Sequence, residues 1–248
     1  MTIKRWLLDL GNTRLKMAPL HKGARGEVTA LPHGDDDFEV ALRAHFDAHD
    51  GDEAWLASVA PPDTTSHLRS LMQDLGIEVQ RVHARAAMAR LKIAYAEPAR
   101  LGVDRFLALL AASERDDGPW LLASAGSALT LDLLGKDGVH VGGLIAPMPA
   151  QMRSALATRF AQLDVPEGQA QDFACDTADA IASGARAAAL GVLEHGWSRA
   201  REKLGCEPTV LVSGGSVDLL LQAQVPRMQA TPSLVLDGMA RYVKEATA

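Results

Sequence analysis

The sequence is poor in the residues that build disulfide frameworks and soft metal sites. Only two cysteines, Cys175 and Cys206, occur among 248 residues, and their separation fits no metal-ligand spacing. Two thiols do not make a disulfide framework, so the sequence favours a reducing compartment. We therefore expect a cytoplasmic protein.

Long hydrophobic runs are also missing. The apolar stretch near the N-terminus reaches only to Asp9, which is too short for the hydrophobic core and cleavage site of a signal peptide. No other stretch approaches the length of a membrane span. We expect no membrane association.

Clustered positive charge and aromatic side chains are scarce. The net charge is −6, aromatic residues make up 4% of the chain, and no Lys/Arg cluster occurs. A nucleic-acid surface needs a basic face and stacking on single strands needs aromatic rings, so we expect no nucleic-acid partner. A small anionic substrate remains possible, because a few local cations can outweigh a mildly acidic surface. None of the eight histidines is spaced like a metal pair, and we interpret five of them as solvated surface residues: His33, His45, His49, His67 and His83.

Hydrophobic residues are abundant, at 48% of the chain, so a sizeable core is expected. In the first part of the chain the patterns predict the order strand, strand, strand, helix, strand, helix, strand. The predicted ranges are Ile3–Asp9, Leu15–Ala18, Glu27–Leu31, Asp36–Ala48, Ala54–Val59, a helix capped by Asp63 or Thr64 that runs to Leu75, and Ile77–Val82.

The second part repeats that opening of three strands followed by helices. Its strands are predicted at Trp120–Ala123, Leu129–Leu134, Val139–Leu144 and Val210–Ser213, and its helices at Gln151–Leu163, Thr177–Leu204 with Asp176 as cap, Ser216–Leu221 and Leu234–Tyr242. A charged stretch, Ser113–Pro119, separates the parts. The repetition predicts two similar α/β halves, 1–115 and 116–248, each with a glycine turn, at Gly11 and at Gly126. Two such turns would offer backbone N–H groups to the phosphates of one nucleotide.

The first motif is Asp9-Leu-Gly-Asn-Thr13, with Lys16 three residues further on. A carboxylate at the end of an apolar strand is costly unless it is compensated, and a magnesium ion that bridges phosphates would compensate it. Gly11 lets the backbone approach a ligand, and Lys16 offers a charge to a phosphate. The same residues also suit a polar β-turn.

The second motif joins Tyr95-Ala-Glu-Pro98 to Leu101-Gly-Val-Asp-Arg105. A strongly helical run follows, so Asp104 and Arg105 are expected in a first helical turn. Asp104 suits that place through the helix dipole, whereas Arg105 does not. A carboxylate base beside a cation that holds an anionic substrate would explain both.

Three weaker glycine-containing segments follow. Gly142-Gly143 would allow a close backbone approach or form a bulge. The segment Ser124-Ala-Gly-Ser-Ala-Leu-Thr-Leu-Asp132 is a weak signal by itself, and Ser213-Gly-Gly-Ser216 would face an adenine ring or form only a tight turn.

Together these motifs resemble those of the type III pantothenate kinases, which belong to the acetate/sugar kinase and actin-like ATPase superfamily. The resemblance covers nearly the whole chain and keeps the motif order. It rests on Asp9-x-Gly-Asn-Thr13, Tyr95-x-x-Pro98, Gly102-x-Asp-Arg105, Ser124-x-Gly-Ser-Ala-x-Thr-x-Asp132, Gly142-Gly-x-Ile-x-Pro147, Thr177-Ala-Asp179 and Leu234-Val-Leu-x-Gly238.

The resemblance implies a duplicated ribonuclease-H-like fold, a homodimer, and ATP-dependent phosphorylation of pantothenate to 4'-phosphopantothenate, the first step of coenzyme A biosynthesis. It also implies Mg2+ and a monovalent cation, K+ or NH4+. Asp104 would be the catalytic base, and Asp9 would hold magnesium together with ATP. The implied ATP-phosphate residues are Asp9, Gly11, Asn12, Thr13, Lys16 and Ser127, and the implied pantothenate residues are Tyr95, Gly102, Val103, Asp104, Arg105 and Thr177.

Two positions depart from the family pattern. Ser124 stands where an aspartate is usual, which weakens the expected monovalent-cation site at that position, and Met148 replaces a usual glycine. These departures keep open a nucleotide-binding regulator of the same fold that does not catalyse. A kinase of the superfamily with another small substrate is a further alternative.

Overall fold

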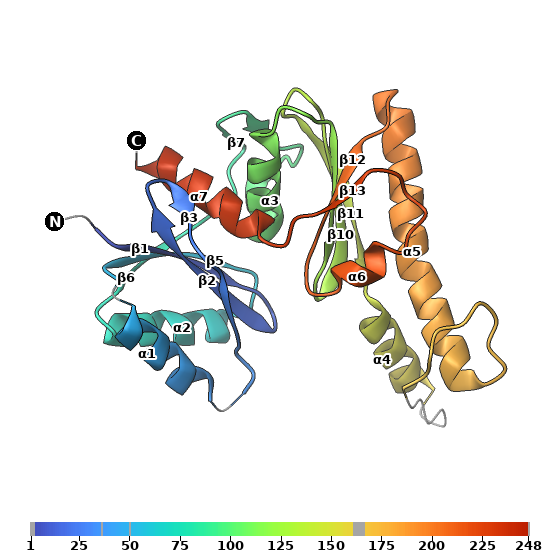
Figure 1. Cartoon of the computed structure of the whole chain (residues 1–248), viewed down its shortest axis with the longest axis horizontal. Helices are drawn as coiled ribbons and strands as arrows, with labels where there is room; N and C mark the ends of the chain where they lie inside the picture. The colour runs from blue at the N-terminus through green and yellow to red at the C-terminus, as the bar shows by residue number, and fades with distance from the viewer. Residues whose placement is uncertain (1–2, 36, 50, 161–166, 248) are drawn as a thin grey trace. The chain divides into compact units, whose positions relative to one another are not determined.

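The computed structural model describes residues 3–35, 37–49, 51–160 and 167–247, and Figure 1 shows their helices and strands. Two compact units divide the chain. The first comprises Met1–Asp116, Asp137–His140 and Ser233–Ala248, and the second comprises Asp117–Lys136 and Val141–Pro232. They differ from the predicted halves chiefly in the last helix, which joins the first unit. The division of the chain at 115/116 into ribonuclease-H-like halves stays a prediction.

The first unit is built on one mixed sheet with the order β3-β2-β1-β5-β6, and β4 also pairs with β2. Strand β1 is antiparallel to β2 and parallel to β5, and β5 is parallel to β6. The elements are β1 (Arg5–Leu10), β2 (Arg14–His21), β3 (Ala24–Arg25), β4 (Thr29–Pro32), α1 (Phe38–Ala48), β5 (Glu53–Ser58), α2 (Pro62–Asp74), β6 (Glu78–Arg81), β7 (Ala87–Met88), β8 (Leu91–Lys92), a 3-10 turn (Pro98–Arg100), α3 (Val103–Ser113) and α7 (Leu234–Ala246).

Helices cover both faces of this sheet (Figure 1). On one face α1 and α2 bury Phe38, Leu42 and Leu68 against the strands, as the spacing of the apolar residues in α1 predicted. On the other face α3 and α7 pack together. Gly238 of α7 lies so close to the backbone of Leu107 in α3 that a β-carbon would collide with it, so a glycine is required at this crossing.

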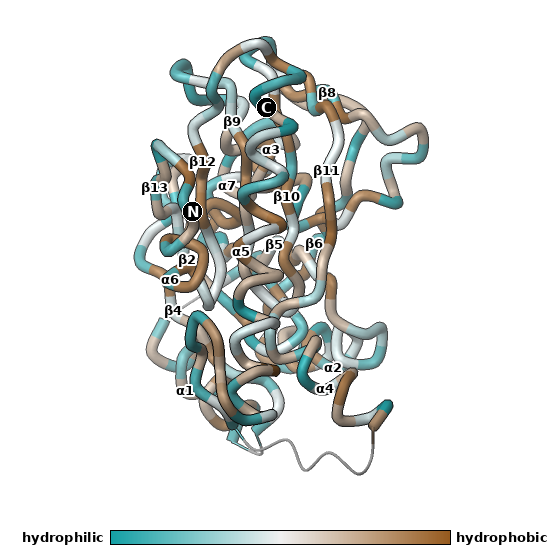
Figure 2. Tube along the Cα trace, turned by 90° about the vertical axis from the view of Figure 1, so that its right-hand side faces the viewer, coloured by the Kyte–Doolittle hydropathy of each residue, from teal (hydrophilic) through white to brown (hydrophobic). Residues whose placement is uncertain are grey.

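The second unit repeats this sheet with the order β11-β10-β9-β12-β13. Its first strand is again central, antiparallel to the second and parallel to the next one, as β9 is to β10 and β12. Figure 2 shows β12 as a largely hydrophobic segment. The elements are β9 (Trp120–Ala125), β10 (Ala128–Leu134), β11 (His140–Pro147), α4 (Pro149–Arg159), α5 (Thr177–Leu204), β12 (Thr209–Ser213), α6 (Val217–Leu220) and β13 (Met228–Ala230).

The long helix α5 begins and ends as its sequence predicts. The Asp176 side chain accepts a hydrogen bond from the backbone N–H of Asp179 at 3.1 Å, and Gly205 ends the helix with a left-handed φ of +67°. Leu193 in the middle of α5 packs in the core of the second unit. Two predicted helices extend onto residues that are not described: the one at 36–48 begins at Asp36, and the one at 151–163 includes 161–163.

The β7–β8 hairpin and β13 were not predicted from the sequence. Each is only two or three residues long, and such short segments carry no hydrophobic period. No helix among the described residues is both long and apolar enough to cross a membrane.

Candidate active site

The turn between β1 and β2 carries the first predicted site residues. Asp9 and Lys16 are directly opposite each other in the antiparallel ladder, so their side chains share one face of the sheet. The turn closes through the Gly11 N–H, which donates to the Arg14 carbonyl at 3.0 Å. Asn12 and Thr13 are exposed at its tip. The polar tip of this turn is therefore accessible to a ligand.

Asp9 has an unusual electrostatic environment. Burial raises the pKa of its carboxyl group from the usual 3.8 to about 6, although the Lys16 ammonium lowers it. The negative charge of Asp104 adds to the rise in this pKa. Two carboxylates from distant parts of the chain are thus close enough to interact, and such perturbed groups are typical of functional sites.

Asp104 is in the first turn of α3, as predicted. Its Oδ1 accepts a hydrogen bond from the backbone N–H of Arg105 at 2.8 Å. A β-carbon on Gly102 would stand only 2.6 Å from that oxygen. The small residue at 102 thus leaves the space that the Asp104 carboxylate occupies, and Val103 between them is the first residue of the helix.

The surroundings of Arg105 account for its place in a first helical turn, which the helix dipole disfavours for a cation. It is only 6% exposed, and its Nη1 donates to the Tyr95 hydroxyl at 3.2 Å. The guanidinium carbon also lies 5.8 Å from the centre of the Tyr95 ring. Burial and these contacts fix a cation beside Asp104, and the two parts of the second sequence motif come together through it.

Sequence reasoning missed His140 as a neighbour of this group. Its ring stacks on Tyr95, with the ring centres 6.0 Å apart and the planes at 14°. Its Nδ1 accepts from the N–H of Ala94 at 3.4 Å, and the side chain is 1% exposed. Nothing in the local sequence around His140 indicated this contact, because the chain returns here from 45 positions further on.

The other predicted site residues belong to the second unit. Ser124 lies near the end of β9, and its ladder partners are Thr130 on β10 and Ser213 on β12. Ser127 is exposed in the turn that follows β9. Thr177 is the first residue of α5 and lines an open pocket of about 670 Å³ beside α4. Asp9, Gly11, Asn12, Thr13, Lys16, Tyr95, Gly102, Val103, Asp104 and Arg105 all belong to the first unit.

A magnesium ion fits Asp9 by its donor chemistry. The carboxylate is a hard oxygen ligand, and burial raises its pKa by more than the Lys16 ammonium lowers it. Across the described part of the chain, no group of three or more His, Cys, Asp or Glu side chains forms a metal cage. Magnesium at such a site takes most of its other ligands from substrate phosphates and water.

Four of the five histidines interpreted as solvated have defined contacts: His33, His45, His49 and His67. The His45 ring packs edge-on against Trp6 with centres 5.0 Å apart, and burial lowers its pKa, with the nearby His49 adding to the effect.

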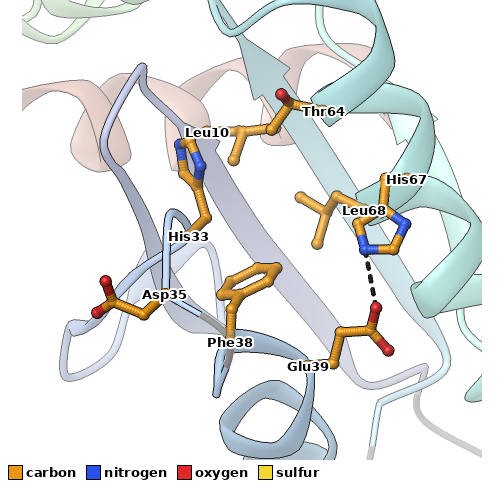
Figure 3. Close-up of a pocket in the computed structure, with 8 residues that line it drawn as sticks. All are labelled: Leu10, His33, Asp35, Phe38, Glu39, Thr64, His67 and Leu68. Atoms are coloured by element: carbon orange, nitrogen blue, oxygen red, sulfur yellow. Dashed lines mark ion pairs between the residues drawn. The ribbon is translucent and has the colours of Figure 1, made fainter.

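Figure 3 shows His33 and His67 in a small pocket behind the β1–β2 turn. The volume of this pocket is about 240 Å³. His67 pairs with Glu39 at 3.0 Å, and the His33 Nε2 is 2.8 Å from the Gly11 carbonyl. The solvated interpretation was wrong for His33 and His45, whereas the His67 side chain is about half exposed.

Solved structures with low sequence identity share the fold. A Campylobacter jejuni protein assigned to the Baf family of transcriptional activators superimposes with a TM-score of 0.60 at 17% identity, over 98% of both chains. The activator of 2-hydroxyisocaproyl-CoA dehydratase from Clostridium difficile, solved with ADPNP, gives a TM-score of 0.51 at 11% identity, over 99% of this chain and 97% of that one. The predicted α/β fold class is confirmed, and these solved structures share the fold of the chain.

Sequence relatives are closer. The type III pantothenate kinase of Xanthomonas axonopodis pv. citri (strain 306) is 42% identical over 99% of both chains. The type III pantothenate kinase of Stenotrophomonas maltophilia (strain K279a) is 44% identical over 96% of both chains. The family model for type III pantothenate kinase matches residues 6–199. With the motifs and the fold in agreement, the chain belongs to the type III pantothenate kinase family.

Proposed function

We propose that this chain uses ATP to phosphorylate pantothenate, with Asp104 as the catalytic base. The observation that carries the assignment is the placement of Asp104 beside the buried Arg105 and within electrostatic reach of Asp9. The first unit then contains the proposed base, the cation that would hold the substrate, and the carboxylate that suits the magnesium ion bound with ATP.

In the proposed reaction the primary hydroxyl oxygen of pantothenate attacks the γ-phosphorus of ATP. The bond between that phosphorus and the β–γ bridging oxygen breaks, and ADP leaves. Asp104 accepts the hydroxyl proton, which is what a general base must do for a poor nucleophile. The products are 4'-phosphopantothenate and ADP. The rest of the catalysis is positioning and charge stabilisation, as in other phosphoryl transfers.

The phosphates of ATP are assigned to the two glycine turns. On the first turn these are the Lys16 side chain, the backbone around Gly11, and the polar groups of Asn12 and Thr13. Ser127 is the corresponding residue of the turn after β9. Asp9 would hold magnesium together with the nucleotide, and the ion would supply positive charge at the transferring phosphoryl group.

The pantothenate pocket is assigned to Tyr95, Gly102, Val103, Arg105 and Thr177. Arg105 supplies the cation for the substrate carboxylate, and its bond to the Tyr95 hydroxyl holds the guanidinium in place. Gly102 leaves room for the Asp104 carboxylate. Asp104 then faces the hydroxyl end of the same substrate.

A homodimer and a weakened monovalent-cation site complete the proposal. Ala178, Ala182, Ala185 and Ala189 recur along α5, where small side chains let a second helix approach closely. Ala185 and Ala189 are buried within the unit itself, so the dimer rests mainly on membership of the family. Light scattering should give twice the mass of the chain, and a monomer mass at working concentration would contradict the dimer.

A cytoplasmic location belongs to the same proposal.

The Met148 departure is accommodated structurally. Its φ of −80° is ordinary for any residue, and its side chain is 4% exposed in the core of the second unit. A glycine is not needed at this position. Of the two departures that keep the non-catalytic regulator open, only Ser124 changes the chemistry of a predicted ligand position.

An ADP-release assay with purified protein tests the function. We expect ADP to form only when ATP, Mg2+ and pantothenate are all present. A regulator without catalysis would bind ATP and release no ADP on addition of pantothenate. A panel of sugars and short acids tests the alternative of a kinase with another substrate. Such an enzyme would release ADP with one of these compounds in preference to pantothenate.

A further inference from the structure

His33 contacts the predicted phosphate turn at two points. Its Nε2 lies 2.8 Å from the carbonyl oxygen of Gly11. Its backbone N–H donates to the carbonyl oxygen of Thr13 at 3.2 Å. One residue, 22 positions beyond Gly11 in the sequence, therefore holds both sides of the turn tip.

The chemistry of the side-chain bond fixes the state of the ring. A carbonyl oxygen only accepts hydrogen bonds, so the His33 Nε2 must carry the hydrogen and donate it. The ring is held in place by Phe38 of α1, edge-on with centres 6.2 Å apart, and Figure 3 shows both side chains in the same pocket. Since α1 packs on the sheet through Phe38, the donor is anchored to the core of the unit.

The bond to Gly11 also sets the direction of the next N–H. The C=O of Gly11 and the N–H of Asn12 belong to one planar trans peptide and point in opposite directions. When His33 holds the carbonyl, the Asn12 N–H points to the opposite side of the turn. The carbonyl before it is held in the same way, because the Leu10 oxygen accepts from the Val59 N–H at 3.1 Å.

We infer that His33 is a positioning residue for the ATP phosphates. It turns the Gly11–Asn12 peptide so that its N–H, and not its carbonyl oxygen, faces the anionic ligand. A flipped peptide would place a partial negative charge against a phosphate oxygen, which the bond to His33 prevents. The inference rests on the proposed role of this turn as a phosphate site.

The test compares His33→Ala with His33→Gln, whose side-chain amide can donate at a similar reach. His67→Ala is the control, since His67 lines the same pocket but pairs with Glu39. The backbone hydrogen bond from residue 33 to Thr13 survives in all of these variants, so His33→Ala frees only the Gly11 carbonyl.

We expect His33→Ala to raise the KM for ATP about five- to tenfold, the usual effect of one lost hydrogen bond. The KM for pantothenate and the melting temperature should stay close to wild type. His33→Gln should recover most of the ATP affinity, and His67→Ala should behave as wild type. If His33→Ala does not fold, His33→Met serves as the non-donating variant.

Three results would overturn the assignment. They are an unchanged KM for ATP in the non-donating variant, an equal rise in both KM values, and a Gln variant no better than Ala. Failure of the kinase proposal looks different, because wild type would then release no ADP with pantothenate. The affinity of a non-hydrolysable ATP analogue for the same variants would still test His33 in that case.

Discussion

The two units carry the same turn with different chemistry. In the first unit the ladder pair before the turn is Asp9 with Lys16, and in the second it is Ser124 with Thr130. The residues occupy equivalent places, one step from the end of the central strand. Ser213 on β12 extends the second pair into a row of three hydroxyl groups. A duplicated fold has thus placed full charges on one copy of the turn and neutral donors on the other.

This asymmetry indicates a division of work within the proposed reaction. Full charges hold a metal ion and phosphates strongly, whereas neutral hydroxyls orient a ligand at a lower desolvation cost. The proposed base also belongs to the charged unit. The experiments below either disable the charged unit or give its chemistry to the neutral one.

The largest effect is expected when the charged unit loses its base. Asp104→Asn keeps the size of the side chain but removes the basic oxygen, and general-base help is worth about 10²–10⁴-fold. We expect kcat to fall by that factor while ATP affinity changes little. Steady-state kinetics and ATP binding by calorimetry measure both quantities.

Asp63→Asn is the matched control for Asp104→Asn, because Asp63 is also an acidic residue in the first turn of a helix. Its kcat should equal that of wild type. A rate for Asp104→Asn above one tenth of wild type would show that another group accepts the proton.

The second prediction gives the neutral unit a charge. Hard cations favour carboxylate oxygens, and two unit charges about 4 Å apart interact by roughly 4 kcal/mol at an effective dielectric near 20. Desolvation of the aspartate cancels much of this gain. Wild type should therefore show weak or no potassium activation. Ser124→Asp should lower the potassium concentration for half-activation about ten- to a hundredfold.

The potassium titration is run in sodium-balanced buffer, with Ser124→Asn as the neutral control. Asp132 or backbone carbonyls could hold the ion without help from position 124. Tight, saturable activation of wild type that stays the same in Ser124→Asp would establish that alternative.

The sequence predicted the repeated parts of the molecule well. Both central strands, the N-cap of α5 at Asp176 and the helical turn around Asp104 follow from periods and capping rules that act over a few residues. The contact of His33 with Gly11 and the stack of His140 on Tyr95 depend on where distant segments meet, and no local pattern encodes them. The placement of α7 on α3 could not be derived either, because the sequence order assigns α7 to the second half.

The third prediction removes the space beside the base. A β-carbon at position 102 would stand 2.6 Å from the Asp104 Oδ1, so in Gly102→Ala the carboxylate must rotate away. Gly102 has a φ of −52°, which alanine adopts without strain. We expect kcat to fall about tenfold, since the rate drops steeply when a catalytic group is misplaced, while the melting temperature stays near wild type.

Gly191→Ala is the control, because a β-carbon there meets nothing within 4 Å. Equal kcat in the two variants would contradict the expected displacement of Asp104.

The smallest effect concerns the stability of the ligand-free charged unit. The pKa of Asp9 is raised by burial from 3.8 to about 6 in the folded chain. Well below pH 3.8 the group is protonated in both folded and unfolded states and contributes nothing. Between about pH 4 and pH 6 the unfolded chain has released this proton while the folded chain retains it, so stability falls with rising pH and levels off above 6. Asp9→Asn removes this cost, and without ATP the variant should be more stable than wild type at pH 7.

The full pKa rise corresponds to roughly 3 kcal/mol, and partial exposure of Asp9 lowers the expected gain to about 1 kcal/mol. Urea unfolding of wild type and Asp9→Asn at pH 4 and pH 7 measures the free energy of unfolding directly. The difference should be small at pH 4, where the loss of stability has only begun, and reach its full size at pH 7. With Mg2+ and ATP present the order at pH 7 should reverse, because the bound cation stabilises the ionised Asp9 of wild type and not the amide. A variant that is less stable than wild type at pH 7 without ligand would mean that the protein itself compensates the charge of Asp9, and the asymmetry between the two turns would then be structural rather than functional.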